Sequence, residues 1–337
     1  MRIPTCSGAR QAWSVRAALL LLIAGATLAA GTGTAGAQTA TTTQAVYRLS
    51  KDSDYQQGCF APCMCPVMIS SGVTGTFILT PAGFDGLFTT YAVTEVNWIV
   101  SLNGTDTFVT GSGTYKVGGE FALQQELALD LQVGDGAVQH FDSGLTGATA
   151  PFPDIDLTIS VNKQTCFDTV FRVSASPVPP DQIRPYRLVA GSTFQRGCFG
   201  ACACAAGPKL PIAGTFALVP LVSTPLWNNY AVINVRWRAF DSSTAGLSSS
   251  SIPVRGFGEY VYGGEFALEQ RMNLMLSVDK SAPTHFDSGL APGGGSFPRI
   301  DVRVSIVGAG CFDTIIDIHA EPRRMPIRRS TRTNGDS

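Results

Sequence analysis

The chain has 337 residues, of which 45% are hydrophobic and 15% charged, and its formal net charge is −1. This balance excludes a wholly disordered chain, because such chains are poor in apolar residues and rich in net charge. The length allows two domains of ordinary size, and the 36 glycines and 20 prolines favour many turns between short strands.

Residues 1–37 have the features of an export signal. Arg2, Arg10 and Arg16 precede an apolar run at 17–30. Ala35-Gly36-Ala37 then matches the small-residue pattern of a signal-peptidase site. We therefore predict cleavage before Gln38 and export to the periplasm or the extracellular space. The alternative is an uncleaved anchor, but the run is shorter than the ~20 apolar residues that a spanning helix needs. No other run has that length, so the mature chain is expected to have no membrane span.

Residues 46–177 and 186–322 are two copies of one module. They match at an offset of 139 residues, which becomes 145 after a six-residue insertion following Trp237. The recurring segments include Gly58-Cys59-Phe60 with Gly197-Cys198-Phe199, Gly118-Gly119-Glu120-Phe121-Ala122-Leu123 with Gly263-Gly264-Glu265-Phe266-Ala267-Leu268, and Cys166-Phe167-Asp168-Thr169 with Cys311-Phe312-Asp313-Thr314. A period near 140 residues is too long for a solenoid and predicts two whole domains. Residues 178–185 are expected to form a proline-rich extended linker, and 323–337 a basic disordered tail.

Period-two hydrophobic patterns predict strands throughout both copies. Apolar residues alternate with mostly polar ones from Phe121 to Val133, which predicts one long half-buried strand that begins after a Gly-Gly hairpin. A second pattern places Ala92, Thr94, Val96, Trp98 and Val100 on one face, which we interpret as core. No helical periodicity is evident. Seven to nine short strands per copy predict an all-β antiparallel sandwich or β-barrel in each.

Eight cysteines follow the predicted cleavage site, four in each copy. They are Cys59, Cys63, Cys65 and Cys166 in the first copy, and Cys198, Cys202, Cys204 and Cys311 in the second. An even number in an exported chain predicts two disulfides per copy, one of them joining the N-terminal cluster to the distant cysteine. The alternative is a thiolate metal site, although the spacing lacks the paired C-x2-C of structural zinc.

The sharpest polar motif is His-Phe-Asp-Ser-Gly-Leu, which occurs in both copies. Its candidate site residues are His140, Asp142 and Ser143, with His285, Asp287 and Ser288 in the second copy. A catalytic triad within four residues is implausible, because triad members converge from separate places on the backbone. We expect a strand that ends in an Asx-type turn, with Asp142 accepting from backbone N–H groups and Gly144 in a left-handed conformation. A ligand site there is the alternative.

Two further sets of polar residues recur in both copies. Asp142, Asp156 and Asp168 match Asp287, Asp301 and Asp313, and would suit Ca2+ if they converged, but they lack the spacing of a calcium loop. Gln125 and Gln270 interrupt an otherwise apolar face. A buried amide needs partners, so each is expected to bond a neighbouring backbone group or to line a small polar cavity.

These features favour an exported, non-catalytic binding or structural protein. Only three histidines occur in the chain and no G-x-S-x-G motif is present, so general bases and activated nucleophiles are scarce. The alternative is an exported hydrolase or metal-binding protein that uses the His-Phe-Asp-Ser-Gly segment or the cysteines. No cofactor is expected. The sequence does not identify the partner, for which a cell-surface or extracellular component is the candidate. Removing 1–37 takes the formal charge from −1 to −4, which disfavours nucleic acid.

Overall fold

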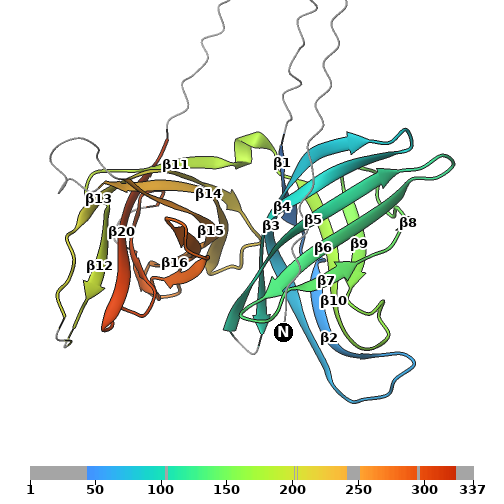
Figure 1. Ribbon diagram of the computed structural model, residues 1–337, viewed down its shortest axis with the longest axis horizontal. Coiled ribbons are helices and arrows are strands. Elements are labelled where there is room, and N and C mark those ends of the chain that lie inside the picture. The colour runs from blue at the N-terminus through green and yellow to red at the C-terminus, as the bar shows by residue number, and fades with distance from the viewer. Residues whose placement is uncertain are drawn as a thin grey trace, which may run out of the picture. The chain divides into compact units, whose positions relative to one another are not determined.

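The computed structural model describes residues 44–102, 105–200, 202, 204–240, 251–293 and 297–323. Within these residues the chain is all-β, with two antiparallel ten-stranded sheets and one short 3-10 turn, η1 (Pro180–Gln182) (Figure 1). The predicted leader, the tail beyond 323 and the inserted residues from 241 onward lie outside the described residues. None of the described helical segments is long and apolar enough to cross a membrane.

The first sheet occupies residues 45–177. Its strands are β1 (Ala45–Leu49), β2 (Asp54–Phe60), β3 (Met68–Phe84), β4 (Phe88–Leu102), β5 (Thr105–Gly118), β6 (Gln124–Val133), β7 (Gln139–Asp142), β8 (Thr146–Gly147), β9 (Ile155–Ser160) and β10 (Cys166–Pro177).

The second sheet occupies residues 184–322. Its strands are β11 (Arg184–Leu188), β12 (Thr193–Cys198), β13 (Leu210–Pro220), β14 (Trp227–Phe240), β15 (Ser251–Gly263), β16 (Glu269–Val278), β17 (Thr284–Asp287), β18 (Ala291–Pro292), β19 (Ile300–Ser305) and β20 (Phe312–Pro322). The strands β11 to β20 follow one another as β1 to β10 do. The expected extended linker instead contains η1, and β11 already begins at Arg184.

Strand pairing returns to its starting point in each sheet. The last strand of the first sheet, β10, pairs with β1 and β2 on one side and with β9 on the other. Strand β9 also meets β7, through Asp142 and Ser160. In the second sheet β20 pairs with β11, β12 and β19, and β19 meets β17. Most backbone N–H and C=O groups of the first and last strands therefore find partners, which protects edges that would otherwise recruit other chains.

Apolar side chains fill the core of each sheet. Trp98 and Trp237 expose only 1% of their surface, which confirms their predicted place in the core. Phe77, Phe141 and Phe171 pack near Trp98, with Trp98 and Phe171 ring centroids 5.5 Å apart. Fully burying such a side chain contributes roughly 1.5–3 kcal/mol, so the core is the main source of stability.

The predicted phase of the strand before Trp98 is wrong. Val93 is buried, whereas Thr94 is exposed, so the core face changes between these residues and Val96. The register of β4 against both β3 and β5 shifts there, and Glu95 has a left-handed φ of 50°. A β-bulge of this kind adds one residue to the strand and inverts its alternation. Asn234, with a φ of 55°, lies in the equivalent shift of β14.

The predicted long strand also begins later than expected. Strand β6 starts at Gln124 rather than at Phe121, and its counterpart β16 starts at Glu269. Phe121 and Phe266 are each 95% exposed, so they belong to a turn and not to the buried face. The alternation from Gln125 to Leu131 is confirmed.

The eight cysteines form four pairs at disulfide distance. Cys59 pairs with Cys65 and Cys63 with Cys166, and the second sheet has the same pattern. There the pairs are Cys198 with Cys204 and Cys202 with Cys311. No pair joins the two sheets. One pair in each sheet connects the loop after its second strand to the start of its last strand, as predicted.

The two kinds of cysteine pair are expected to contribute unequally to stability. The Cys63–Cys166 pair encloses a separation of 103 residues and Cys59–Cys65 only 6. In the chain-entropy model these closures contribute about 4.7 and about 2 kcal/mol. Unfolding in guanidinium should therefore show a larger loss for Cys63→Ser/Cys166→Ser than for Cys59→Ser/Cys65→Ser. Equal losses, or the reverse order, would contradict the assigned pairing.

Candidate functional site

The His-Phe-Asp-Ser-Gly-Leu segment of the first sheet is strand β7 followed by a turn. Asp142 accepts a hydrogen bond from the Gly144 N–H at 2.8 Å, and Gly144 has a φ of 62°. Phe141 is fully buried in the core and Thr146 continues the chain into β8. The geometry is that of an Asx turn, in which the carboxylate stands in for a backbone acceptor.

The Ser143 hydroxyl is part of the backbone pairing between β6 and this turn. It accepts from the Leu127 N–H at 2.9 Å and donates to the Gly144 carbonyl at 2.8 Å. The Ser143 N–H donates to the Leu127 carbonyl at 3.1 Å. The hydroxyl proton is therefore engaged by a carbonyl oxygen, and no imidazole is placed to remove it.

The second sheet repeats this geometry. Ser288 accepts from the Met272 N–H at 2.9 Å and donates to the Gly289 carbonyl at 2.7 Å. Asp287 accepts from the Gly289 N–H at 3.0 Å, and it also receives a bidentate pair of bonds from Arg271. The guanidinium hydrogen bond lowers the pKa of Asp287, although burial opposes this. Glu126 stands at the position of Arg271 in the first sheet, so only the turn itself is common to both.

Each of the two candidate histidines contacts a side chain of the neighbouring strand. The His140 Nδ1 atom lies 2.8 Å from Oδ1 of Asp130 on β6, and both side chains are more than 60% exposed. In the second sheet His285 contacts the Asn273 amide oxygen on β16. The structure thus brings each histidine to a neighbouring strand, while Asp142, Ser143 and their counterparts face the turn. The six residues do not form a single catalytic constellation.

A buried carboxylate clamps the loop between β9 and β10. Asp168 is 2% exposed and accepts from four backbone N–H groups, those of Val161, Asn162, Gln164 and Thr169, at 2.7–3.2 Å. The loop includes Gln164 with a φ of 57°, a conformation that costs a non-glycine residue about 1 kcal/mol or more. The four bonds offset that cost. Asp313 holds the β19–β20 loop in the same way.

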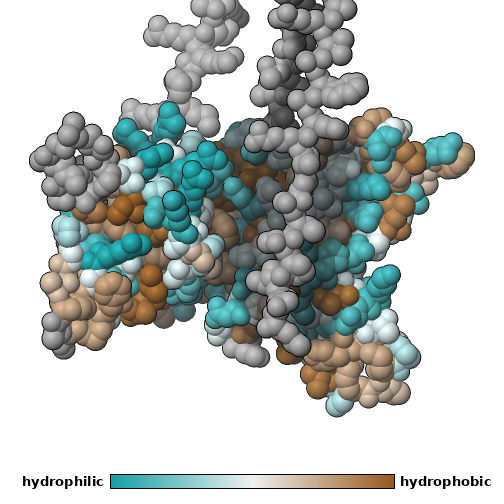
Figure 2. Space-filling model, in the orientation of Figure 1, coloured by the Kyte–Doolittle hydropathy of each residue, from teal (hydrophilic) through white to brown (hydrophobic). Residues whose placement is uncertain are grey.

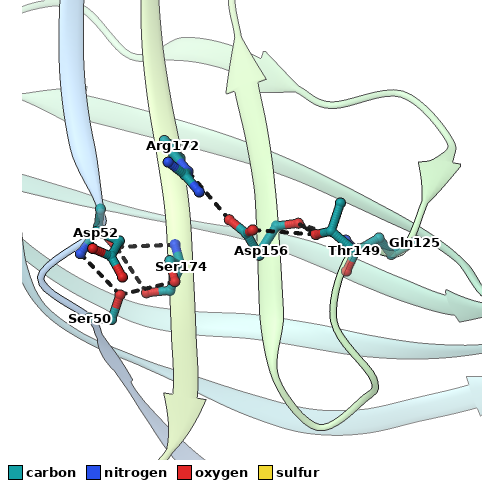
Figure 3. Close-up of polar contacts among 8 residues, drawn as sticks. Ser50, Asp52, Gln125, Thr149, Asp156, Arg172 and Ser174 are labelled. Atoms are coloured by element: carbon teal, nitrogen blue, oxygen red, sulfur yellow. Dashed lines mark hydrogen bonds and ion pairs between the residues drawn. The ribbon is translucent and has the colours of Figure 1, made fainter.

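Polar contacts around Asp156 tie β6, β9 and β10 together (Figure 3). Gln125 donates to the Asp156 carbonyl at 2.9 Å and accepts from the Tyr115 hydroxyl at 3.1 Å. Thr149 donates to the same carbonyl, and the Arg172 guanidinium lies 3.4 Å from the Asp156 carboxylate. The backbone bond expected for Gln125 is confirmed, as it is for Gln270, which donates to the Asp301 carbonyl at 2.7 Å.

The three recurrent carboxylates therefore serve separate structures. Asp142 closes a turn, Asp156 pairs with Arg172, and Asp168 holds a loop. Among the described residues, no group of three or more histidine, cysteine, aspartate or glutamate side chains is arranged to hold a metal ion.

Two features were not singled out by the sequence. The first is the exposure of Phe121, which extends the predicted Gly-Gly hairpin and is described further below. The second is Glu259 on β15, a buried acidic residue with only 7% of its surface exposed. Burial raises the pKa of Glu259 to about 7. The available signal was that Glu259 stands where the first sheet has Thr114, so that a carboxylate replaces a neutral side chain on this strand.

Comparison with protein families, with curated proteins and with solved structures finds no match. Assignment of function therefore depends on the geometry of this chain alone.

Asp168 is expected to matter more for stability than Asp142. Asp168→Ala removes the acceptor of four N–H groups, of which Val161 keeps a bond to the Thr169 carbonyl at 3.3 Å. At about 1 kcal/mol for each of the other three, we expect a loss of roughly 3 kcal/mol. Asp142→Ala removes one bond in a partly exposed turn and should cost about 1 kcal/mol. Urea unfolding of the two variants tests the order. A larger loss for Asp142→Ala would refute this account of the loop.

Glu259 is expected to make stability depend on pH. Its folded-state pKa of about 7 exceeds the ordinary value of 4.5. The contribution of Glu259 to the free energy of unfolding is therefore complete below pH 4.5, and it is lost as the pH rises through 7. Glu259→Gln should become more stable than the natural chain above pH 7, by up to about 3 kcal/mol. Thermal melts from pH 4 to 9 measure this, with Glu265→Gln, an exposed position, as the control. A pH-independent difference would contradict the assignment.

Proposed function

We propose that this chain is an exported, non-catalytic binding or structural protein made of two duplicated β modules, at 46–177 and 186–322. The observation that carries the proposal is the engagement of Ser143 and Ser288. Their hydroxyls bond backbone groups on both sides, and so are part of the fold. Paired cysteines accord with an oxidising compartment such as the periplasm or the extracellular space.

We further infer that each module is a closed barrel rather than a sandwich. The support is the pairing of β10 with both β2 and β9, and of β20 with both β12 and β19. A closed sheet with a filled core offers its loops and outer faces to a partner. Binding of a cell-surface or extracellular component by those surfaces fits this arrangement.

The alternative is an exported hydrolase or metal-binding protein. A hydrolase that used the recurrent segment would have to break the bond of Ser143 to Gly144 and turn His140 away from Asp130. A thiolate metal site would have to open the cysteine pairs. Neither change is favoured by the geometry, so binding without catalysis is the better supported function.

The mature disulfide-bonded protein provides the test. We expect no turnover of chromogenic esters, phosphate esters or glycosides, because the Ser143 and Ser288 hydroxyls are not activated. We also expect saturable binding of labelled protein to washed envelopes of the producing cell. This binding should persist in His140→Ala/His285→Ala. Turnover that disappears in Ser143→Ala/Ser288→Ala would establish the hydrolase instead, and absence of envelope binding would refute the binding proposal.

A further inference from the structure

The turn between β5 and β6 presents a phenylalanine to solvent, and the equivalent turn of the second sheet does the same. Phe121 and Phe266 are each 95% exposed. Leucines accompany them, with Leu87 45% and Leu123 42% exposed in the first sheet, and Leu226 48% and Leu268 55% in the second. We call each set of one phenylalanine and two leucines an apolar tip.

The backbone builds both apolar tips to one geometry. The Gly119 N–H donates to the Leu87 carbonyl at 3.2 Å, and the Ala148 N–H donates to the Leu123 carbonyl at 2.8 Å. The first bond joins the β5–β6 turn to the β3–β4 turn, and both turns lie at one end of the sheet (Figure 1). In the second sheet Gly264 and Gly293 make the equivalent bonds, at 3.0 and 2.7 Å.

The two glycines that precede each apolar tip phenylalanine in the β5–β6 turn and its counterpart are required by the fold. A Cβ atom on Gly118 would lie 2.1 Å from the Leu87 carbonyl oxygen, and one on Gly119 would lie 2.1 Å from the Ala122 carbonyl oxygen. Gly119 also has a φ of 131°. These contacts explain the Gly-Gly pair in both copies.

The phenylalanine has no such explanation. A side chain that is 95% exposed packs against almost nothing, yet Phe121 and Phe266 stand at equivalent positions of the two sheets, within the identical run Gly-Gly-Glu-Phe-Ala-Leu. Exposed apolar groups that cluster lower solubility and mark interaction surfaces. Figure 2 shows hydrophobic residues among polar ones at the end of the first sheet that carries these turns.

We propose that the two apolar tips insert into the surface of a phospholipid bilayer with zwitterionic headgroups. Each tip exposes three apolar side chains to solvent, which suits contact with an apolar surface. Aromatic and leucine side chains are suited to the boundary between headgroups and acyl chains. The cross-turn N–H groups of Gly119 and Ala148 are already bonded, which lowers the cost of entering an apolar medium.

The charge beside each tip selects the headgroup. Glu120 and Glu265 are exposed and directly precede the phenylalanines. A carboxylate at headgroup level is attracted by the ammonium of choline or ethanolamine and repelled by an anionic lipid. The formal charge of −4 after loss of 1–37 acts in the same direction. A protein partner with an apolar groove is the other possible occupant and becomes an outcome of the test.

This inference rests on the proposed binding function and specifies its target. The mature full chain is mixed with unilamellar vesicles of phosphatidylcholine, and the bound fraction is measured by sedimentation. We expect binding that falls at least about tenfold in Phe121→Ser/Phe266→Ser, because each phenylalanine supplies a large part of the inserted area. Added phosphatidylglycerol should weaken binding at low salt. Since both side chains are exposed, the melting temperature should not change.

A matched control comes from the opposite end of the sheets. Phe167 and Phe312 are 57% and 72% exposed and are also identical in the two copies. They lie at the start of β10 and β20, beside the cysteine pairs. Phe167→Ser/Phe312→Ser should keep full vesicle binding. If this control lost binding while the tip variant kept it, the proposed surface would be wrong.

Depth of insertion separates the lipid from other targets. Phe121→Trp should gain fluorescence that is quenched by phosphatidylcholine brominated in its acyl chains. Absence of both vesicle binding and quenching would overturn the lipid proposal. If envelope binding then remained and still required Phe121 and Phe266, the partner would be a protein and the binding function would stand. Loss of envelope binding by the natural chain would refute the binding function itself.

Discussion

The structure depends on one long-range constraint, the return of the last strand of each sheet to the first. Strand β10 pairs residue by residue with β2, from Cys166 opposite Phe60 to Arg172 opposite Asp54. More than a hundred residues separate these partners, so the closure carries a large entropic cost that local contacts do not recover. Two features at the start of β10 offset this cost. The cysteine pair from Cys63 holds the strand covalently, and the buried carboxylate of Asp168 fixes the loop that leads into it.

Closure in turn limits where function can lie. Because β10 pairs on both sides, apolar side chains from several strands share one core, as Trp98, Phe141 and Phe171 do. The inward-facing amide of Gln125 is bonded on both sides, to the Tyr115 hydroxyl and to a carbonyl of β9, as a buried amide requires. The turns and the outer faces are released from these demands.

Much of the fold follows from the sequence because period-two patterns report burial directly. The all-β class, the strand from Gln125 to Leu131 and the buried tryptophans were accessible in this way. The cysteine count predicted a link from the N-terminal cluster to Cys166, but not that Cys63 makes it. The bulge at Glu95 could not be predicted in this way. The extra residue shifts the alternation by one position, and the patterns before and after it each look regular. The prediction that the long strand begins at Phe121 was wrong for a related reason. Its place in the alternation continues the strand, but the close approach required at Gly119 forces the chain into a turn first.

In the candidate site, too, local features could be predicted and contacts between distant strands could not. The Asx turn was predictable because Asp-Ser-Gly specifies it locally, within three residues. The partners of His140 and the four donors of Asp168 depend on which strands become neighbours, and that information is distributed along the whole chain. Comparison of equivalent positions in the two sheets recovers part of this information. Recurrent residues that are buried or bonded, such as Asp168 and Asp313, are explained by folding. Recurrent residues that are almost fully exposed, such as Phe121 and Phe266, are not, and they direct the search for function to the tips.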